Sequence, residues 1–377
     1  GYTVSISAPN FKDVNGNYTF TTQNGVITVK PRTIVFTVAN AEITYGENFS
    51  EQAVTVDFDK SRLVGDDTAE DITSNGDAPK FLVSTKYDYT SNYDAGVYDL
   101  TARPSFTTSA NYDVQVVNGK LTVKKADLKI KAKNITVKYG SDVPDLSRQY
   151  ELIGAKKGDT LINAKTSGEI VFGTTYSKGS VVNAEGYSFY IDISGATFKN
   201  YNASVENGVI TVEKADPVIS KYPTASVTYG QTLADAVFAG GEANINGEYV
   251  YDRADIMPAW QEAPWTIYAA TFIPEDTVNY NTVKELYISL KVNKKQITGD
   301  LAVTGNPMFN ETLTVDVSGL DPNTAGTYTF EWTIGGVTVG TGTSIKLDKE
   351  SYVGSTVIVK ATATGYFTGS VSYETTK

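Results

Sequence analysis

Any chemistry in this chain must come from carboxylates, hydroxyls, lysines and aromatic rings, because the sequence contains neither cysteine nor histidine. The absence of both residue types excludes a disulfide framework, a thiolate nucleophile and a zinc site built from Cys and His. It also excludes a Ser-His-Asp relay. We therefore expect no cofactor.

One segment, Asp57–Asp77, concentrates carboxylates that could coordinate calcium, which prefers oxygen ligands. The segment has only two basic residues, Lys60 and Arg62. Its acidic residues are Asp57, Asp59, Asp66, Asp67, Glu70, Asp71 and Asp77. The EF-hand template fails, because Arg62 stands where its glycine is required and Thr68 stands where its bidentate glutamate is required. Since runs of charge usually face water, we predict a solvated acidic loop without a metal site.

The aromatic residues offer a better functional lead, with 25 Tyr, 15 Phe and 3 Trp in the chain. Tyrosine suits half-exposed positions, where the ring packs and the hydroxyl stays wet. One region is crowded with aromatic side chains, namely Tyr249, Tyr251, Trp260, Trp265 and Tyr268. A platform that stacks against sugar rings is one hypothesis for this group. Ordinary packing in the core of a small β domain is the alternative, and it is favoured because Trp is usually highly buried.

Charge and hydropathy limit the partners. The chain has 32 Lys+Arg against 43 Asp+Glu, a formal charge of −11, which argues against a nucleic-acid binder. No stretch approaches the roughly 18 apolar residues of a membrane-spanning helix, so we expect no direct membrane insertion.

Three short sequence markers recur in the same order along the chain. Tyr-Gly appears at Tyr45-Gly46, Tyr139-Gly140 and Tyr229-Gly230, with steps of 94 and 90 residues. Asn-Gly followed by an apolar strand appears at Asn24-Gly25, Asn118-Gly119 and Asn207-Gly208. Asn-Tyr appears at Asn17-Tyr18, Asn111-Tyr112, Asn200-Tyr201 and Asn279-Tyr280. Such a period is the signature of a tandem array of structural repeats.

The ends of the repeats are marked by short seams such as Lys124–Asp127 and Glu213–Asp216. These seams leave little of the slack of a Gly/Ser linker. We predict the closing part of a repeat at 1–32, complete repeats at 33–126, 127–215 and 216–294, and a different final domain at 295–377. Because residues 1–32 lack a first strand to pair with Val26–Val29, we expect them to be mobile or paired with another chain.

Within each repeat the apolar residues alternate with a period of two, which is typical of β-strands. We read Asn118-Gly119 and its counterparts as type I′ hairpin turns, in which both central residues need positive φ. Tyr45, Tyr139 and Tyr229 each end a first strand, and the following glycine supplies the turn. The only helical candidates are short, at Asp142–Arg148 and Thr68–Ile72. The sequence therefore predicts an all-β, elongated tandem array of small domains.

The motifs resemble a known family. Tyr139-Gly140, then Gly158–Leu161, then the closing Asn-Tyr and Asn-Gly markers of 127–215 resemble the YGX-type MBG repeat of large bacterial surface proteins and adhesins. Residues 216–294 resemble a related repeat marked by Tyr229–Leu233, and 295–377 resemble a bacterial Ig-like module. The resemblance implies β-grasp-like and Ig-like domains in an extracellular protein, at the bacterial cell surface or secreted.

The sequence is compatible with two functions. One is a non-catalytic stalk that spaces or presents a binding tip. The other is a module that binds host glycan, mucin or another surface protein through the aromatic residues of 216–294. Paired carboxylates could in principle form a glycosidase. An enzyme, however, would place unusual residues on long loops around one pocket, whereas these repeats are short and alike. We therefore expect no catalytic residue, and a monomer or weak self-association through residues 1–32.

The predicted array can be tested by small-angle X-ray scattering of the monomer. Four domains of this size placed end to end would have a radius of gyration near ~36 Å, whereas one compact globule of this length would have about 21 Å. A measured value close to the compact figure would contradict the array.

Overall fold

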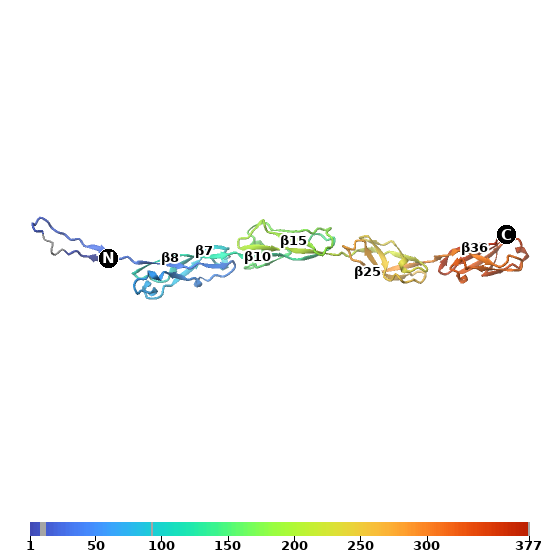
Figure 1. Ribbon diagram of the computed structural model, residues 1–377, viewed down its shortest axis with the longest axis horizontal. Helices are drawn as coiled ribbons and strands as arrows, with labels where there is room; N and C mark the ends of the chain where they lie inside the picture. The colour runs from blue at the N-terminus through green and yellow to red at the C-terminus, as the bar shows by residue number, and fades with distance from the viewer. Residues whose placement is uncertain (8–12, 92, 376–377) are drawn as a thin grey trace. The chain divides into compact units, whose positions relative to one another are not determined.

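The computed structural model describes residues 1–7, 13–91 and 93–375 (Figure 1). Among these residues the longest helical segments, η3 (Ala69–Ile72) and α1 (Leu161–Ala164), have four residues each, and the regular structure is otherwise strand and short 3₁₀ turns. The all-β prediction is confirmed. No helix in this described part has the length and apolar character that a bilayer crossing would need.

The chain divides into two compact units. The first comprises Gly1–Ile135, Val143–Ser177 and Tyr187–Ile210. The second comprises Thr136–Asp142, Lys178–Gly186 and Thr211–Lys377.

In the first unit, residues 32–124 form two packed sheets. The order of one sheet is β5 (Val56–Phe58), β3 (Arg32–Val38), β8 (Tyr112–Val117). The order of the other is β4 (Ala41–Thr44), β9 (Gly119–Lys124), β7 (Gly96–Pro104), β6 (Phe81–Thr85). Alternation along β3 buries Ile34, Phe36 and Val38 and leaves the residues between them exposed. Phe36 is the centre of an aromatic core, with ring centroids 4.8 Å from Phe58 and 4.7 Å from Phe81.

The first and last strands of this domain run side by side and cross from one sheet to the other together. β8 pairs with β3 in parallel, and β9 pairs with β4 in parallel. β8 and β9 lie in different sheets, so Asn118-Gly119 joins two sheets and is not a hairpin turn. Neither Gly119 nor Gly208 has positive φ. The hairpin prediction is therefore wrong at both positions.

Glycine is required at this crossing for a different reason, which is close approach of two backbones. A Cβ on Gly119 would lie 2.7 Å from the carbonyl oxygen of Val38 and 2.8 Å from that of Ala39. The same crossing recurs at Gly208, where a Cβ would lie 3.1 Å from the carbonyl oxygen of Lys133. Asn40 and Asn134 hold the two crossings, since their side-chain oxygens accept the backbone N–H of Lys120 and Val209.

Residues 126–213 repeat this arrangement of strands. One sheet has the order β12 (Tyr150–Ile153), β10 (Ala126–Ala132), β17 (Tyr201–Glu206). The other has the order β11 (Ile135–Lys138), β18 (Gly208–Glu213), β15 (Tyr187–Asp192), β14 (Val171–Thr174). The helix predicted at Asp142–Arg148 is absent, because the Asp145 side chain accepts the Ser147 N–H and holds a turn instead. The candidate at Thr68–Ile72 is the 3₁₀ turn η3.

The second unit contains two further domains. Residues 219–293 form a five-stranded sheet in the order β21 (Val237–Ala239), β20 (Thr224–Thr228), β25 (Val283–Asn293), β24 (Thr266–Pro274), β23 (Gly247–Tyr251). The last domain packs β32 (Val337–Thr341), β31 (Tyr328–Ile334), β34 (Val357–Ala363) and β36 (Ser370–Glu374) against β28 (Ala302–Thr304), β29 (Thr312–Asp316) and β33 (Ser344–Lys346). Trp332 is fully buried in it and donates its indole N–H to the Gly342 carbonyl at 2.9 Å.

Substitution of Gly119 by alanine should open the crossing. The new Cβ would meet two backbone oxygens below contact distance, so the strands must separate at a cost of about 1–3 kcal/mol. We expect amide hydrogen exchange in β4 and β9 to quicken by at least about fivefold, the factor that corresponds to about 1 kcal/mol. Gly96→Ala is the matched control, since a Cβ at the start of β7 has open space around it. Equal exchange in the two variants would refute the close-approach explanation.

Candidate functional site

The five aromatic residues predicted as a sugar platform do not share one exposed face. Tyr251 is buried, and Tyr249 and Tyr268 pack with it in the core of residues 219–293. Trp260 is half-buried and its ring lies 5.6 Å from that of Tyr366 in the last domain. Trp265 is 37% exposed, with the Lys291 ammonium 5.9 Å from its ring centre. Sugar stacking thus stays a prediction, with Trp265 as the ring most open to solvent among the five.

The acidic segment Asp57–Asp77 uses several carboxylates to terminate local turns. Asp59 accepts the Ser61 N–H, and Asp71 accepts the Thr68 N–H in a capping box before η3. Asp67 accepts the hydroxyl of Tyr112. Within the described ranges no three acidic side chains converge as a metal ligand set would.

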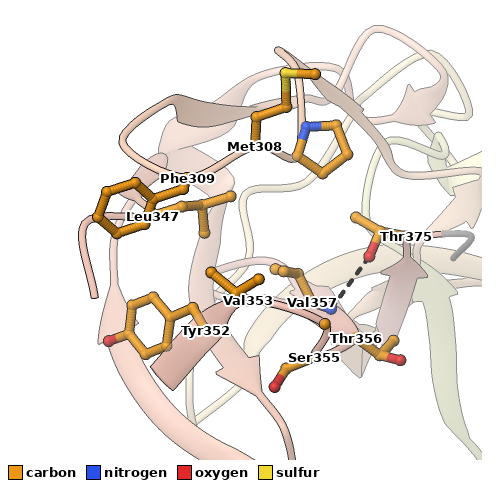
Figure 2. Close-up of a pocket in the computed structure, with 11 residues that line it drawn as sticks. Met308, Phe309, Leu347, Tyr352, Val353, Ser355, Thr356, Val357 and Thr375 are labelled. Atoms are coloured by element: carbon orange, nitrogen blue, oxygen red, sulfur yellow. Dashed lines mark hydrogen bonds between the residues drawn. The ribbon is translucent and has the colours of Figure 1, made fainter. Parts of the chain in front are cut away.

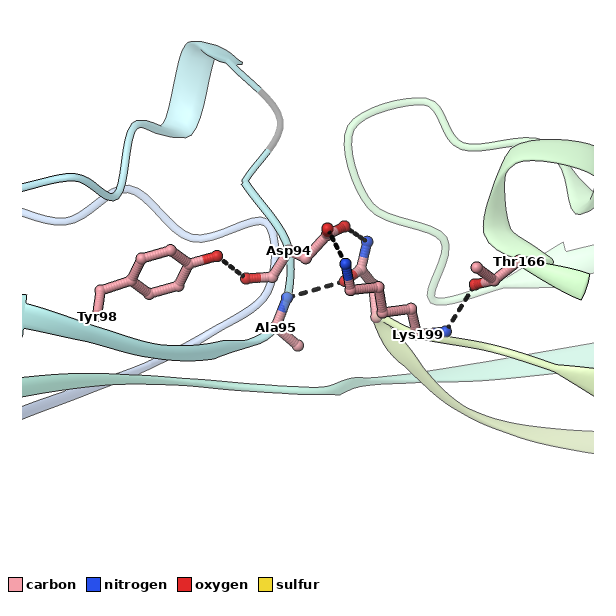
Figure 3. Close-up of polar contacts among 6 residues, drawn as sticks. Asp94, Ala95, Tyr98, Thr166 and Lys199 are labelled. Carbon is pink, nitrogen blue, oxygen red and sulfur yellow. Dashed lines mark hydrogen bonds and ion pairs between the residues drawn. The ribbon is translucent and has the colours of Figure 1, made fainter.

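The repeated sequence markers instead meet where one domain adjoins the next. We define the first joint as the contact of Tyr45, Asp94 and Ala95 with Lys199, Asn200 and Tyr201. Figure 3 shows its polar part, in which Asp94 and Ala95 face Lys199. The Asn200 side chain accepts the Ala95 N–H at 2.8 Å and donates to Asp94 at 2.9 Å. The Lys199 ammonium donates to the other oxygen of Asp94. One asparagine thus satisfies both a backbone and a side-chain group of the preceding domain.

Charge reinforces this contact. The hydrogen bond from Lys199 lowers the pKa of the Asp94 carboxyl below its ordinary value, and Asn200 adds to this effect while partial burial opposes it. Asp94 in turn raises the pKa of Lys199. Both groups therefore stay charged over a wide range around neutral pH.

Two tyrosines form the apolar part of the first joint. The rings of Tyr45 and Tyr201 meet edge to face, with centroids 5.5 Å apart and planes at 77°. Both hydroxyls donate to one carboxylate oxygen of Asp159, at 3.3 Å and 2.6 Å respectively. Burial, with the bond to Asp159, raises the pKa of Tyr201. Gly46 has φ of +84°, and a Cβ on it would lie 2.6 Å from Cβ of Lys156, so the turn also lies against the next domain.

The second joint has the same construction. The rings of Tyr139 and Tyr280 meet edge to face at 5.4 Å and 78°. The Asn279 side chain accepts the Val182 N–H at 2.8 Å, as Asn200 does for Ala95. Asn279 is only 5% exposed, and its amide group donates to Asp276.

At the third joint the Tyr-Gly tyrosine is again in contact with the next domain, but its partners differ from those at the first two joints. Tyr229 lies 4.8 Å from the ring of Tyr366 and 5.6 Å from that of Phe367. Trp260 also packs on Tyr366, and the Lys294 ammonium lies 5.3 Å from the centre of the Trp260 ring. An aromatic cluster here replaces the Asn-Tyr marker.

The seam lysines also act at the joints. Lys125 donates to the Phe198 carbonyl at 2.9 Å, and Lys214 donates to the Thr277 carbonyl at 2.6 Å. From the sequence, the Tyr-Gly marker was expected to have a purely local role, Asn279 was recognised only as part of a repeat marker, and neither Asp94 nor Lys199 was singled out. The recurrence of Asn-Tyr at the repeat spacing marked Asn279, but not its contact with Val182.

The last domain contains a cavity of about 690 Å³ at the end where Thr375 leaves β36 (Figure 2). Its side chains are mainly apolar, including Met308, Phe309, Leu347 and Val353. Among the described residues that line it there is no carboxylate, lysine or arginine.

The first joint makes a pH-dependent prediction. Because the pKa of Asp94 is lowered, its ion pair contributes above the ordinary Asp pKa of about 3.9 and is lost as pH falls through the lowered value. Lys199→Ala should raise the Asp94 pKa toward its ordinary value, as measured by carboxyl ¹³C NMR. Lys129→Ala removes a similar exposed ion pair, with Glu206, and should leave Asp94 unchanged. An unaltered Asp94 pKa in Lys199→Ala would contradict the pairing.

No protein-family model and no curated protein matches the chain. Among solved structures, it is similar to Drosophila N-cadherin EC1-3, at 12% identity over 64% of this chain and 96% of that chain, with a TM-score of 0.21. It is also similar to the I-band fragment I67-I69 from titin, at 12% identity over 78% and 96%, with a TM-score of 0.24. The N-terminal four Ig domains of Dscam1 isoform 4.4 match at 10% identity over 77% and 81%, with a TM-score of 0.16. At such TM-scores these similarities carry no argument about function.

Proposed function

We propose that the chain is a non-catalytic spacer segment of an extracellular bacterial surface protein, in which the joints fix each domain against the next. The observation that carries the proposal is that the repeated markers meet at the joints: Tyr45 with Tyr201 and Tyr139 with Tyr280. A spacer needs its joints to resist bending, and these residues act there.

The physical basis is that the joints combine three kinds of contact. An edge-to-face tyrosine pair contributes about 0.5–1.5 kcal/mol beyond its buried area. An asparagine accepts a backbone N–H of the preceding domain, as Asn200 does from Ala95, and each such bond contributes about 0.5–1.5 kcal/mol net. The seam itself is pinned, because the Ala126 N–H donates to the Asn200 carbonyl and the Ala215 N–H donates to the Asn279 carbonyl.

The apolar cavity near Phe309 and the turn-capping roles of Asp59 and Asp71 also favour a non-catalytic role. The resemblance of 127–215 to MBG repeats supports the extracellular location. Other parts of the protein would then bind a partner such as host glycan, mucin or another surface protein, and this segment would hold those parts at a distance. The exposed Trp265 ring is the place within this chain where glycan binding would be sought.

The spacer proposal predicts a stiff first joint. Because the chain has no cysteine, spin labels at Asp113→Cys and Lys133→Cys, both exposed positions, are the only thiol labels present. We expect a narrow distance distribution by double electron–electron resonance. Removing the polar contacts with Lys199→Ala and Asn200→Ala together should widen the distribution about twofold, because several net-stabilising hydrogen bonds are lost.

The matched control is Lys129→Ala with Asn202→Ala, which removes the same residue types from contacts inside one domain, with Glu206 and Asp127. That control should keep the narrow distribution. A broad distribution in the unaltered chain would reject the spacer function.

A further inference from the structure

The ribbon formed by β1 (Tyr2–Val4) and β2 (Gly25–Ile27) reproduces part of a complete repeat. Val4 pairs with Gly25 and Tyr2 with Ile27. In the next domain Leu100 pairs with Gly119 and Tyr98 with Leu121 in the same antiparallel manner. In the domain after it, Phe189 pairs with Gly208 and Tyr187 with Ile210. The ribbon therefore has the register of two strands that lie inside a sandwich elsewhere in the chain.

In the ribbon, the apolar residues of this register are uncovered. Ile27 is 57% exposed and Val29 is 70% exposed. Their equivalents in the two complete repeats are between 0% and 2% exposed, namely Leu121, Val123, Ile210 and Val212. In those repeats a parallel first strand, such as β4 beside β9, pairs with the strand that corresponds to β2. β2 has no such neighbour among the described residues, where it pairs with β1 alone.

The start of β8 has the same contacts as the side of the first joint that contains Tyr201, although no preceding domain of the described chain is docked on it. The Tyr112 hydroxyl donates to Asp67 at 2.5 Å and accepts the Val64 N–H at 3.1 Å. Tyr201 makes the same two bonds in the first joint, to Asp159 at 2.6 Å and from Lys156 at 2.9 Å. A cavity of about 540 Å³ lies here, lined by Asp67, Asn111 and Tyr112 together with the ends of the ribbon.

Asn111 precedes Tyr112 as Asn200 precedes Tyr201, but no preceding domain among the described residues shields it from solvent. Asn111 is exposed, whereas Asn200 is half-buried and Asn279 is 5% exposed at the joints that are filled. The backbone of Asn111 is already placed as at those joints, since its carbonyl accepts the Arg32 N–H at 2.9 Å. One side of a joint is therefore formed here, and the domain that would dock on it is missing from the described residues.

We propose that the ribbon and the Asp67–Asn111–Tyr112 cavity together bind the opening half of a further repeat, of the kind seen at 33–94, joined directly before Gly1. The strand equivalent to β4 adds in parallel to β2, and the facing sheet, which contains the strand equivalent to β3, covers Ile27 and Val29. The tyrosine of its Tyr-Gly turn enters the cavity, and its hydroxyl donates to Asp67 as Tyr45 donates to Asp159.

The occupant is a segment in the same chain for a structural reason. In a second copy of the chain, the opening strands β3 and β4 are already paired with β8 and β9 of their own domain. A second copy therefore has no free opening half to give without unfolding a domain. The inference rests on the ribbon and the joint geometry and is independent of the spacer function.

The test extends the full chain by placing a copy of residues 33–94 directly before Gly1. Amide exchange in Gly25–Val29 should slow by at least about 100-fold in a verified monomer, relative to the unextended chain. The side-chain amide resonance of Asn111 should shift in the extended chain. The ring resonances of Tyr112, which corresponds to Tyr201, should shift as well. The Tyr112 resonances should not shift when the added copy carries Tyr45→Ala, which keeps the strands and removes the ring.

A scrambled version of the added segment is the control for length and composition, and it should leave Gly25–Val29 unprotected. A second donor, a copy of residues 127–183, guards against a folding failure peculiar to the first. Exchange as fast with both donors as with the scrambled segment would overturn the proposal. Protection of the ribbon in the unextended chain, or only in a dimer, would overturn it as well. Protection without the shift of the Tyr112 ring resonances would reject the tyrosine cavity.

Discussion

The parallel pairing of first and last strands is the constraint on which the repeats depend. β3 with β8 and β4 with β9 are aligned in the same direction, so the chain enters a domain at one end and leaves it at the other. The Asn-Tyr marker stands at the entry end, where β8 and β17 begin. The Tyr-Gly marker stands at the exit end, after β4 and β11. Because the two markers lie at opposite ends, the exit of one domain meets the entry of the next.

Much of this organisation could be predicted from sequence, because it is local or periodic. Alternation with period two gave the strands, and the spacing of Tyr-Gly and Asn-Tyr gave the repeats. The Asn118-Gly119 pair was misread because a hairpin and a sheet crossing share the same short signal. What distinguishes them is the proximity of Val38 and Ala39, which are far away in the sequence. Glycine is needed there for space, and no single-strand pattern reveals that requirement.

The joints could not be predicted for a related reason. Asp94 and Lys199 are ordinary surface residues by type, and only the docking of two domains brings their charges together. The aromatic residues of 216–294 follow the favoured packing interpretation in part. Tyr249, Tyr251 and Tyr268 crowd together in sequence because they line one core, while Trp260 contacts the neighbouring domain at the third joint. A cluster in sequence therefore marked packing, whereas dispersed and repeated single residues marked the contacts between domains.

The parallel alignment of β3 and β8 has a mechanical consequence. Tension transmitted through the two neighbours of a domain would act on Arg32 at the entry and on Lys124 at the exit. These forces would slide β3 and β4 past β8 and β9, along the direction of the strands. The hydrogen bonds of the β3–β8 and β4–β9 ladders lie across that direction, so they would be loaded together and not broken one at a time. Each domain is thus arranged to withstand shear along the chain, the load that a tether between two surfaces carries.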